Sequence, residues 1–317
     1  MTQIQDHPHR YALANELHAR PFPALKVPCR AAFLAVKSPR DAAARDKSAD
    51  RAHLLALLDR YGAPHPQPEA THYFGQIGKY QLKWESHTEF VTYTIFSEGV
   101  ADRPFDGASF DVFSKDWLAQ MPGVRITSAL IRVEETTDDD TIRSFVNEWF
   151  VAESLAVARV VDDNAVLAGD FRIDEAGHMR FAVFARPGTG ERRVGRIVQR
   201  LCEIETYKTM AMLGLTEARG LNDDLSGIED ALSSLTGDMS AGSTAAADTL
   251  SDLLNASARL ENLITKSSFR FGATGAYEAI VNQRVKVLRE ERFNGRQTFA
   301  EFMMRRFDPA MRTVKAS

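Results

Sequence analysis

The sequence predicts an α+β protein: two β-α-β-β-β-α halves that form an α/β sandwich-like domain, followed by an all-helical C-terminal region. The first observation is that short apolar runs of strand length recur in one order in residues 30–120 and again in residues 124–215. The second is that strand-like runs cease after Gly220, where apolar residues recur at helical spacing. We therefore divide the chain into an N-terminal arm (1–29), an α+β domain (30–220) and a helical region interpreted as a truncated stalk (221–317).

The first half opens with an apolar run of strand length, Ala31–Lys37. Ser38 and Pro39 follow it, and a Ser directly before a Pro is typical of a helix start, so we expect a helix from there to Gly62. Three further strand-like runs (72–77, 80–85 and 89–96) and a helix at about 109–120 complete this half.

The second half has the same order of elements. Val124–Val133 is strand-like, and Thr137 is expected to cap a helix that runs through Trp149, with acidic residues in its first turn where the helix dipole favours them. Three strands (155–161, 166–173 and 179–184) and a long helix beginning at Thr189 or Gly190 complete the order. We therefore predict an internal structural repeat; the alternative is a single irregular α+β domain.

The helical region contains an apolar stripe, with Leu250, Leu253, Ser257, Leu260 and Ile264 at 3-4-3-4 spacing. Ser257 interrupts it, and the stripe is shorter than the roughly three to four heptads of a coiled coil, so we expect a surface helix packed on a neighbour. Other helices are expected at 222–235, 274–292 and 297–306, with a Gly/Ser linker at 236–244. Residues 297–317 form an amphipathic stretch without a helix-ending signal, so we expect an anchoring segment to be missing beyond it.

Composition narrows the class of protein. A net charge of −4 argues against a nucleic-acid-binding protein. Cys29 and Cys202 lie far apart, which excludes a disulfide framework and indicates a reducing compartment. The N-terminus lacks an apolar signal segment, and no run approaches the ~18 apolar residues of a membrane span, so the chain as given is expected to be soluble. No histidines have metal-site spacing and the glycines of residues 270–277 have the wrong spacing for a dinucleotide site, so we predict no metal and no cofactor.

The richest polar cluster lies in the middle of the first half, between Trp84 and Phe90. If the backbone stays extended there, Glu85, His87 and Glu89 share one face of a sheet. Two carboxylates beside an imidazole raise the pKa of the histidine and suit acid–base catalysis, so these three residues are the catalytic candidates. A turn near Ser86 would divide the set, and the alternative is a solvated network of charges across neighbouring strands.

His18, Arg20, Trp84 and Arg132 are the candidate ligand-binding residues. His18 and Arg20 precede Pro21 in the N-terminal arm, and we expect them to reach the sheet beside Trp84 and pair with a carboxylate. Arg132 lies in an apolar strand and needs a partner if it is buried. Docking of the arm also requires burial of its apolar side chains, which are Tyr11, Leu13, Leu17 and Phe22.

Four segments resemble one family: HPHRYALANELHARPF, KWESHTEFVTYTIF, ETYKTMAMLGL and FRFGATGAYEAIVNQRVKVLREERFNGRQTFAEFMMRRFDPAMRTV. Together they are similar to the uncharacterised, membrane-anchored bacterial proteins called domain of unknown function 3422. The resemblance covers nearly the whole chain. It implies a protein on the cytoplasmic face of the bacterial inner membrane, anchored through a C-terminal segment that this chain lacks. It carries over no catalytic residue, and its recurring motifs here contain His18, Arg20, Trp84, Glu85, His87 and Glu89.

Three functions are compatible with these observations. The favoured hypothesis is a ligand- or partner-sensing oligomerisation module of a membrane-anchored protein, a homo-oligomer that is not an enzyme and binds no nucleic acid. The first alternative is an enzyme in which His87 acts with Glu85 or Glu89, while Arg20 or Arg132 holds an anionic small molecule. The second is a regulatory domain of a channel-like or transporter-like membrane protein, which rests on analogy of layout alone.

Overall fold

The computed structural model describes residues 4–16, 22–39, 44–241 and 246–317. The chain folds into two compact units. Unit 1 comprises Met1–Glu203 and Val287–Phe299, and unit 2 comprises Ile204–Lys286 and Ala300–Ser317. The division falls inside the long helix α5 (Glu191–Ala241), whereas the change in sequence pattern lies at Gly220.

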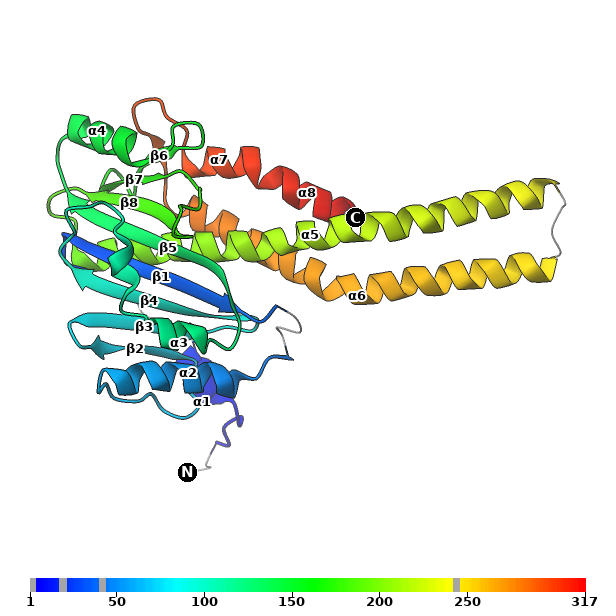
Figure 1. The fold of residues 1–317 in the computed structure, drawn as a ribbon, viewed down its shortest axis with the longest axis horizontal. Helices are drawn as coiled ribbons and strands as arrows, with labels where there is room; N and C mark the ends of the chain where they lie inside the picture. Colours follow the sequence, from blue (N-terminus) through cyan, green and yellow to red (C-terminus); the bar gives the residue numbers. More distant parts are fainter. Residues whose placement is uncertain (1–3, 17–21, 40–43, 242–245) are drawn as a thin grey trace. The chain divides into compact units, whose positions relative to one another are not determined.

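Within the described residues, unit 1 is built on a nine-stranded mixed sheet of order β2-β3-β4-β1-β5-β8-β7-β6-β9 (Figure 1). The strands are β1 (Cys29–Lys37), β2 (His72–Ile77), β3 (Tyr80–Ser86), β4 (Phe90–Glu98), β5 (Val124–Glu135), β6 (Ala156–Val160), β7 (Ala165–Gly169), β8 (Met179–Ala185) and β9 (Glu291–Arg292). The predicted α+β class is confirmed, and the first eight strands lie within a few residues of their predicted positions.

The two halves of the sheet share the order of their elements, but their strands do not run in the same relative directions. The chain runs β1, α2 (Lys47–Arg60), β2, β3, β4 and α3 (Lys115–Ala119), and then β5, α4 (Asp139–Trp149), β6, β7, β8 and α5. Strand order is also equivalent on the two sides of the central β1–β5 pair. However, β4 is antiparallel to β1, whereas β8 is parallel to β5. The internal repeat therefore stays a prediction, because the second meander runs the other way relative to its first strand.

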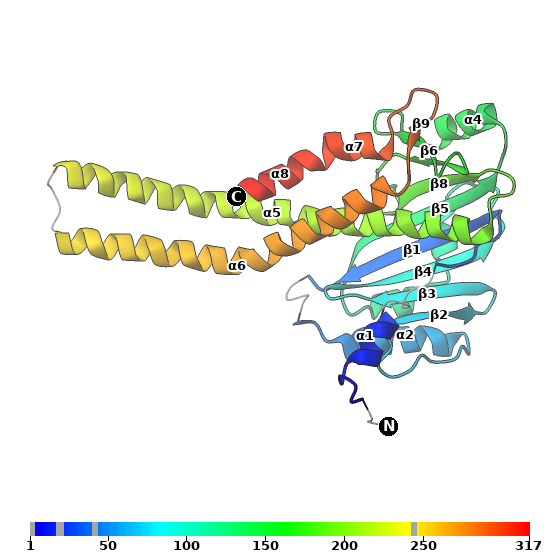
Figure 2. The same cartoon turned by 180° about the vertical axis from the view of Figure 1, so that it is seen from behind.

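Helices cover both faces of the sheet (Figures 1 and 2). On one face, α2, the short 3-10 helix η2 (Gly107–Phe110) and α3 cover the first half and α4 covers the second half. The core under α2 and α3 includes Leu34, Leu57 and Trp84. The first turns of α5 cover the opposite face, and their buried side chains include Val194 and Ile197.

Three helix starts differ from the sequence prediction. α2 begins at Lys47, because the side chain of Asp46 accepts a hydrogen bond from Ser48 N and caps the helix there. Residues 40–43, where the expected helix would start, lie outside the described residues. α4 is capped in the same way by Asp138, where Thr137 was expected. The single helix expected at 109–120 is divided into η2 and α3.

The C-terminal region is not helical throughout. The helix expected at 274–292 is the last part of α6 (Ala246–Lys286), which ends at Lys286 and does not reach Arg292. Residues 287–299 then return to the sheet, where β9 pairs with β6. Val161 N donates to Leu288 O (2.8 Å), and Val157 N donates to Gln297 O (2.9 Å). This segment therefore belongs to unit 1.

Unit 2 contains the remainder of α5, the whole of α6, the helix α7 (Phe299–Arg306) except its first residue, and the helix α8 (Asp308–Ala316). α5 and α6 lie side by side and antiparallel, and we call this pair the helical hairpin (Figures 1 and 2). The rings of Tyr207 and Tyr277 stack at 5.6 Å. A Cβ atom on Gly214 would lie 2.3 Å from the hydroxyl oxygen of Thr274, so Gly214 permits the close approach of the two helices.

A heptad pattern on α5 runs along the helical hairpin. Its residues alternate at spacings of three and four: Ile204, Tyr207, Ala211, Gly214, Ala218, Leu221, Leu225, Ile228, Leu232, Leu235 and Met239. Because α5 continues through Ala241, the linker expected at 236–244 is wrong over 236–241, and its last part, 242–244, lies outside the described residues. Buried residues on the adjoining part of α6 are small, for example Thr249, Ala256 and Ser267.

Candidate functional site

A turn divides the three catalytic candidates. β3 ends at Ser86, and His87 N donates to Phe90 O (2.9 Å) to close the turn into β4. The backbone is therefore not extended from Glu85 to Glu89, and the turn near Ser86, which the sequence left open as an alternative, is present. His87 lies in the turn with its ring stacked on Phe90 at 4.3 Å, while Glu89 is buried. A catalytic role for Glu85, His87 and Glu89 stays a prediction, without the shared face on which it was based.

Arg45 holds this turn, and the sequence analysis missed it. Its Nη2 donates to His87 O (2.6 Å) and to Phe90 O (3.0 Å), and its Nη1 donates to Thr88 O. Its Nε donates to Asp50 Oδ2 (2.7 Å), and both side chains of this ion pair are buried. Arg45 lies in an irregular segment before α2, where periodicity gives no signal, so only the fold reveals its partners.

Trp84 lies on the opposite side of the sheet from Glu85. It is buried among aromatic residues, between Tyr73 and Tyr93 on the neighbouring strands. Beside this cluster, His53 contacts the Tyr93 hydroxyl through Nδ1 (3.0 Å) and the Trp117 carbonyl through Nε2 (2.9 Å). A carbonyl can only accept, so Nε2 carries the proton and Nδ1 accepts from Tyr93. Burial lowers the pKa of His53 and favours this neutral form.

Glu85 takes part in a polar network beneath α5. Lys83 Nζ lies 3.1 Å from Glu85 Oε1 and donates to Gln199 Oε1 (2.7 Å). Gln199 Nε2 in turn donates to Glu203 Oε1 (2.8 Å). The Lys83 side chain is buried, so the network supplies the partners that a buried ammonium group requires. The hydrogen bond from Lys83 to Gln199 therefore links β3 to α5 within unit 1.

The candidates His18 and Arg20 lie outside the described residues, as does Leu17, so their contacts with the sheet stay predictions. The expected burial of Tyr11 and Leu13 is wrong, because these side chains are 68% and 66% exposed. They lie in the short helix α1 (Arg10–Glu16), on which Arg10 and Ala14 are also exposed.

The described end of the arm docks on α5 and not at Trp84. Pro23 and Leu25 are buried, and Leu25 N donates to Glu191 O (3.1 Å). Phe22 lies under the guanidinium group of Arg196 at 4.9 Å. The docking surface is the beginning of α5, on the face of the sheet that α5 covers.

Arg132 has the partner that its strand position required. Its Nε donates to Glu134 Oε1 (2.7 Å), and its Nη1 donates to Ala101 O. The guanidinium group also lies 5.3 Å from the ring centroid of Trp149. The expectation that this arginine is paired is therefore confirmed.

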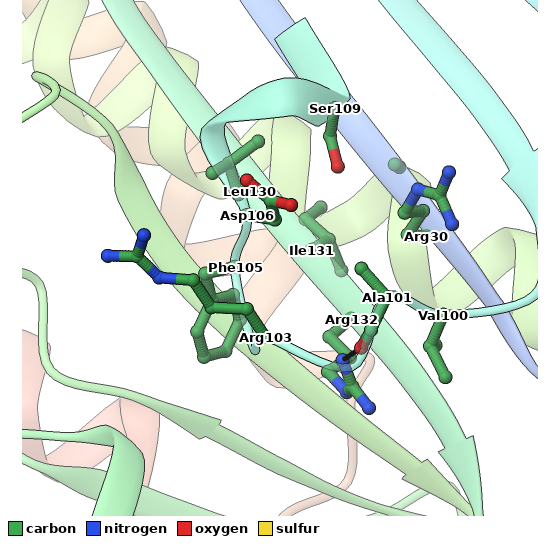
Figure 3. Close-up of a pocket in the computed structure, with 11 residues that line it drawn as sticks. Arg30, Val100, Ala101, Arg103, Phe105, Asp106, Ser109, Leu130, Ile131 and Arg132 are labelled. Carbon is green, nitrogen blue, oxygen red and sulfur yellow. Dashed lines mark hydrogen bonds between the residues drawn. The ribbon is translucent and has the colours of Figure 1, made fainter.

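Arg132 also lines a small pocket at the centre of the sheet, which we call the arginine pocket (Figure 3). It opens between β1, β5 and the loop that follows β4. Its lining residues are Arg30, Ala31, Val100, Ala101, Arg103, Phe105, Asp106, Ser109, Leu130, Ile131 and Arg132. Arg30 and Arg132 are direct register partners on β1 and β5, so two cations start from adjacent positions on one face. The sequence analysis found Arg132 but not this pairing, because register is not readable from single strands.

A second surface feature lies on the helical hairpin. Five large apolar residues of α6 are between 40% and 62% exposed, and we call them the outer stripe: Leu250, Leu253, Leu254, Leu260 and Ile264. Four of them belong to the apolar stripe found in the sequence. The helix does pack on a neighbour, α5, but it does so through its small residues and leaves the outer stripe uncovered in this chain.

Comparison with known proteins identifies a family. The chain matches, over residues 5–317, the family described as "Protein of unknown function (DUF3422)". No curated protein and no solved structure matches the chain. The matched range includes both the arginine pocket and the outer stripe. The chain therefore belongs to the DUF3422 family of proteins of unknown function.

Proposed function

We propose that this chain is a self-assembly module in which the helical hairpin pairs with the hairpin of a second copy. The observation that carries the proposal is the outer stripe. Its five residues, four leucines and one isoleucine, lie on successive turns of α6 and are between 40% and 62% exposed. Single exposed apolar residues are normal on a protein surface, but five on one side of a helix, interrupted only by Ser257, are typical of an interaction surface.

The distribution of charge on α6 supports an apolar contact. At about 100° per residue, the side of the helix centred on Ser257 carries the outer stripe and, between residues 250 and 264, a single charge, Glu261. Asp252, Arg259 and Lys266 lie on roughly the opposite side. The uncharged side therefore suits a partner that excludes water, and the charged side suits solvent.

The pattern of the outer stripe favours a second copy as the partner. Leu250 and Ile264 lie seven residues before and after Ser257, and Leu254 and Leu260 lie three residues before and after it. Two copies packed antiparallel about a two-fold axis at Ser257 would therefore bring Leu250 against Ile264 and Leu254 against Leu260. A two-fold interface uses the same patch on both subunits, and four of the five stripe residues pair with each other in this way, while Leu253 would lie against Glu261. The small Ser257 side chain allows close approach at the axis.

The family resemblance adds a location to this proposal. We propose that the assembly stands at the cytoplasmic face of a bacterial inner membrane and is anchored by a segment outside this sequence. In the part of the chain that the structure describes, no helix has both the length and the apolar character needed to cross a membrane. Expression of a longer natural chain tests this location: it is expected in the membrane fraction, and recovery in the soluble fraction would contradict it.

Light scattering tests the assembly. We expect the 317-residue chain to have about twice its monomer mass of 35.3 kDa, and we expect Leu254→Asp or Leu260→Asp to reduce the mass to that of a monomer. A charge at the centre of a desolvated apolar interface cannot be solvated there, so one substitution per copy is sufficient. The matched control is Phe269→Asp, because Phe269 is 53% exposed on the same helix but lies about 120° around it from Ser257.

The control variant is expected to keep the dimer mass, and circular dichroism should show equal helix content in all variants. Two results would overturn the proposal. One is a monomeric parent chain at every concentration up to its solubility limit. The other is binding of the monomer to lipid vesicles that is lost in Leu254→Asp, since the outer stripe would then be a membrane contact.

A further inference from the structure

We propose that the arginine pocket binds a small oxyanion, the carboxylate or phosphate group of a ligand, through Arg30. The pocket lies wholly within unit 1, so this inference is independent of the proposed assembly. It rests on three observations: an unfavourable pair of like charges, unused donors on Arg30, and the size of the cavity.

The like charges belong to Arg30 and Arg132. They face each other across the β1–β5 pair, where Cβ atoms of opposed residues lie about 4.5–5.5 Å apart and like charges destabilise the sheet. Glu134 neutralises Arg132, with Oε1 at 2.6 Å from Nη2. Among the described residues, Arg30 has no carboxylate partner and donates only to Gly99 O, at 3.3 Å. An anion beside Arg30 would offset the repulsion that the sheet otherwise retains.

Arg30 also has donors without acceptors. Its Nε is buried and has no hydrogen-bond partner in the structure. A guanidinium group presents its N–H donors in a planar fork that matches a carboxylate or phosphate with two parallel hydrogen bonds. Figure 3 shows the Ser109 hydroxyl directed into the space between Arg30 and Asp106, where it can add a further donor.

The lining of the pocket has a net positive charge only through Arg103. Its lining contains three arginines, Arg30, Arg103 and Arg132, against the carboxylate of Asp106. One oxygen of Asp106 is already engaged, because Asp106 Oδ1 accepts from Ala108 N at 3.0 Å. With Glu134 included, Arg30 and Arg132 are matched by two carboxylates, and the excess positive charge is that of Arg103. Arg103 is exposed, and its side chain extends away from the other two arginines (Figure 3).

The size of the cavity limits the ligand. Its volume is about 10 Å³, which is room for about one water molecule. One oxygen of an oxyanion therefore enters, and the rest of the ligand stays at the mouth. The roof is the loop after β4, in which Gly99 O and Ala101 O accept from Arg30 and Arg132. Phe105 anchors this loop through edge contacts with Trp149 and Phe150.

Thermal unfolding and calorimetry test the inference with inorganic phosphate and with acetate, each compared with sodium chloride at equal ionic strength. We expect at least one oxyanion to raise the melting temperature of the parent chain beyond the chloride effect. Arg30→Gln removes both charge and fork and should abolish this shift. Arg103→Gln removes an equal charge that points elsewhere and should keep most of it. The two probes distinguish a phosphate from a carboxylate ligand.

Arg30→Lys keeps the charge without the planar fork, so we expect its dissociation constant to be at least about tenfold weaker. This variant keeps the inference testable if Arg30→Gln does not fold. The same binding is expected in Leu254→Asp, which separates a failure of this inference from a failure of assembly. The inference is overturned if neither oxyanion exceeds chloride, or if Arg30→Gln or Arg30→Lys binds as tightly as the parent chain.

Discussion

His53 is a buried residue whose protonation couples folding to pH. Burial lowers its pKa below the ordinary value of 6.5, so the unfolded chain takes up a proton at higher pH than the folded protein does. The stability that neutral His53 contributes is therefore present above pH 6.5 and is lost as the pH falls toward the lowered folded pKa. We expect the urea midpoint to fall between about pH 7 and pH 5, and to fall less steeply in His53→Gln.

His9→Gln is the control, because His9 is an exposed residue of the arm and its replacement should leave the slope unchanged. His178 is also buried with a lowered pKa, so His53→Gln should reduce the slope without removing it. If His53→Gln and the parent chain lose stability equally on acidification, the neutral state assigned to His53 is wrong.

Arg45 supports a second prediction at this scale. Its guanidinium group binds carbonyls of the β3–β4 turn and the carboxylate of Asp50, and both ionic side chains are buried. Removing one partner of a buried pair leaves an uncompensated charge, so Arg45→Leu should lower the free energy of unfolding by about 3–5 kcal/mol. Arg143→Leu removes an exposed ion pair and should cost no more than about 1 kcal/mol. Equal costs in urea titrations would contradict this role.

For single residues, the sequence predicted a role correctly where that role depended on one strand alone. The position of Arg132 between apolar residues predicted that it is paired, and it is paired with Glu134. The relation of Glu85 to His87 and Glu89 depended on a turn, and one hydrogen bond from His87 N to Phe90 O determines it. The predicted strands, 80–85 and 89–96, leave room for this turn, but the sequence alone did not decide whether it forms.

At the scale of elements, the glycines of α5 give a prediction with an internal control. A Cβ atom on Gly195 would lie 1.7 Å from the carbonyl oxygen of Pro23, so alanine there must displace the arm. Gly220 has no such neighbour within 4 Å. Alanine exceeds glycine in helix propensity by about 0.8–1.0 kcal/mol, so Gly220→Ala should stabilise the protein by about that amount. Gly195→Ala should lower the melting temperature and expose residues 22–28 to proteolysis.

Equal stabilisation by both substitutions would show that the arm does not pack on α5.

The arm also shows how far the contacts of an element could be predicted from the sequence. Its docking was expected from Tyr11, Leu13, Leu17 and Phe22, but Tyr11 and Leu13 are exposed and Leu17 lies outside the described residues. The described contacts come from Phe22, Pro23 and Leu25.

Element boundaries were predictable where a periodic pattern was long. The first eight strands and the start of α5 were found from alternation and apolar spacing. β9 was missed because two residues carry no period, and they are held by pairing with β6 across more than a hundred residues of sequence. The linker at 236–244 was inferred from small polar residues, but the heptad that ends at Leu235 and Met239 extends the helix through this composition.

At the scale of the whole molecule, the order of elements was predictable and the direction of pairing was not. Both halves follow β-α-β-β-β-α, yet β4 is antiparallel to β1 while β8 is parallel to β5. Strand direction is set by non-local hydrogen bonds and by connections that a linear pattern does not contain. The like-charge pair of Arg30 and Arg132 arises from the same non-local register.

The proposed assembly also belongs to this scale, because it concerns surface that one copy leaves uncovered. The most direct measurement is oxidative cross-linking of Ser257→Cys. A disulfide requires Cα atoms within about 7 Å, which two copies reach only near the proposed two-fold axis. The native thiols of Cys29 and Cys202 are buried, so they should not interfere. Asn255→Cys is the matched control, since Asn255 is also exposed but lies about 160° around α6.

Under mild oxidation at low protein concentration, we expect Ser257→Cys to form a covalent dimer that is resolved by reducing agent. Asn255→Cys should remain monomeric on the same gel, and adding Leu254→Asp to Ser257→Cys should abolish the cross-link. Equal cross-linking of Ser257→Cys and Asn255→Cys, or none in either, would contradict pairing of two copies through the outer stripe.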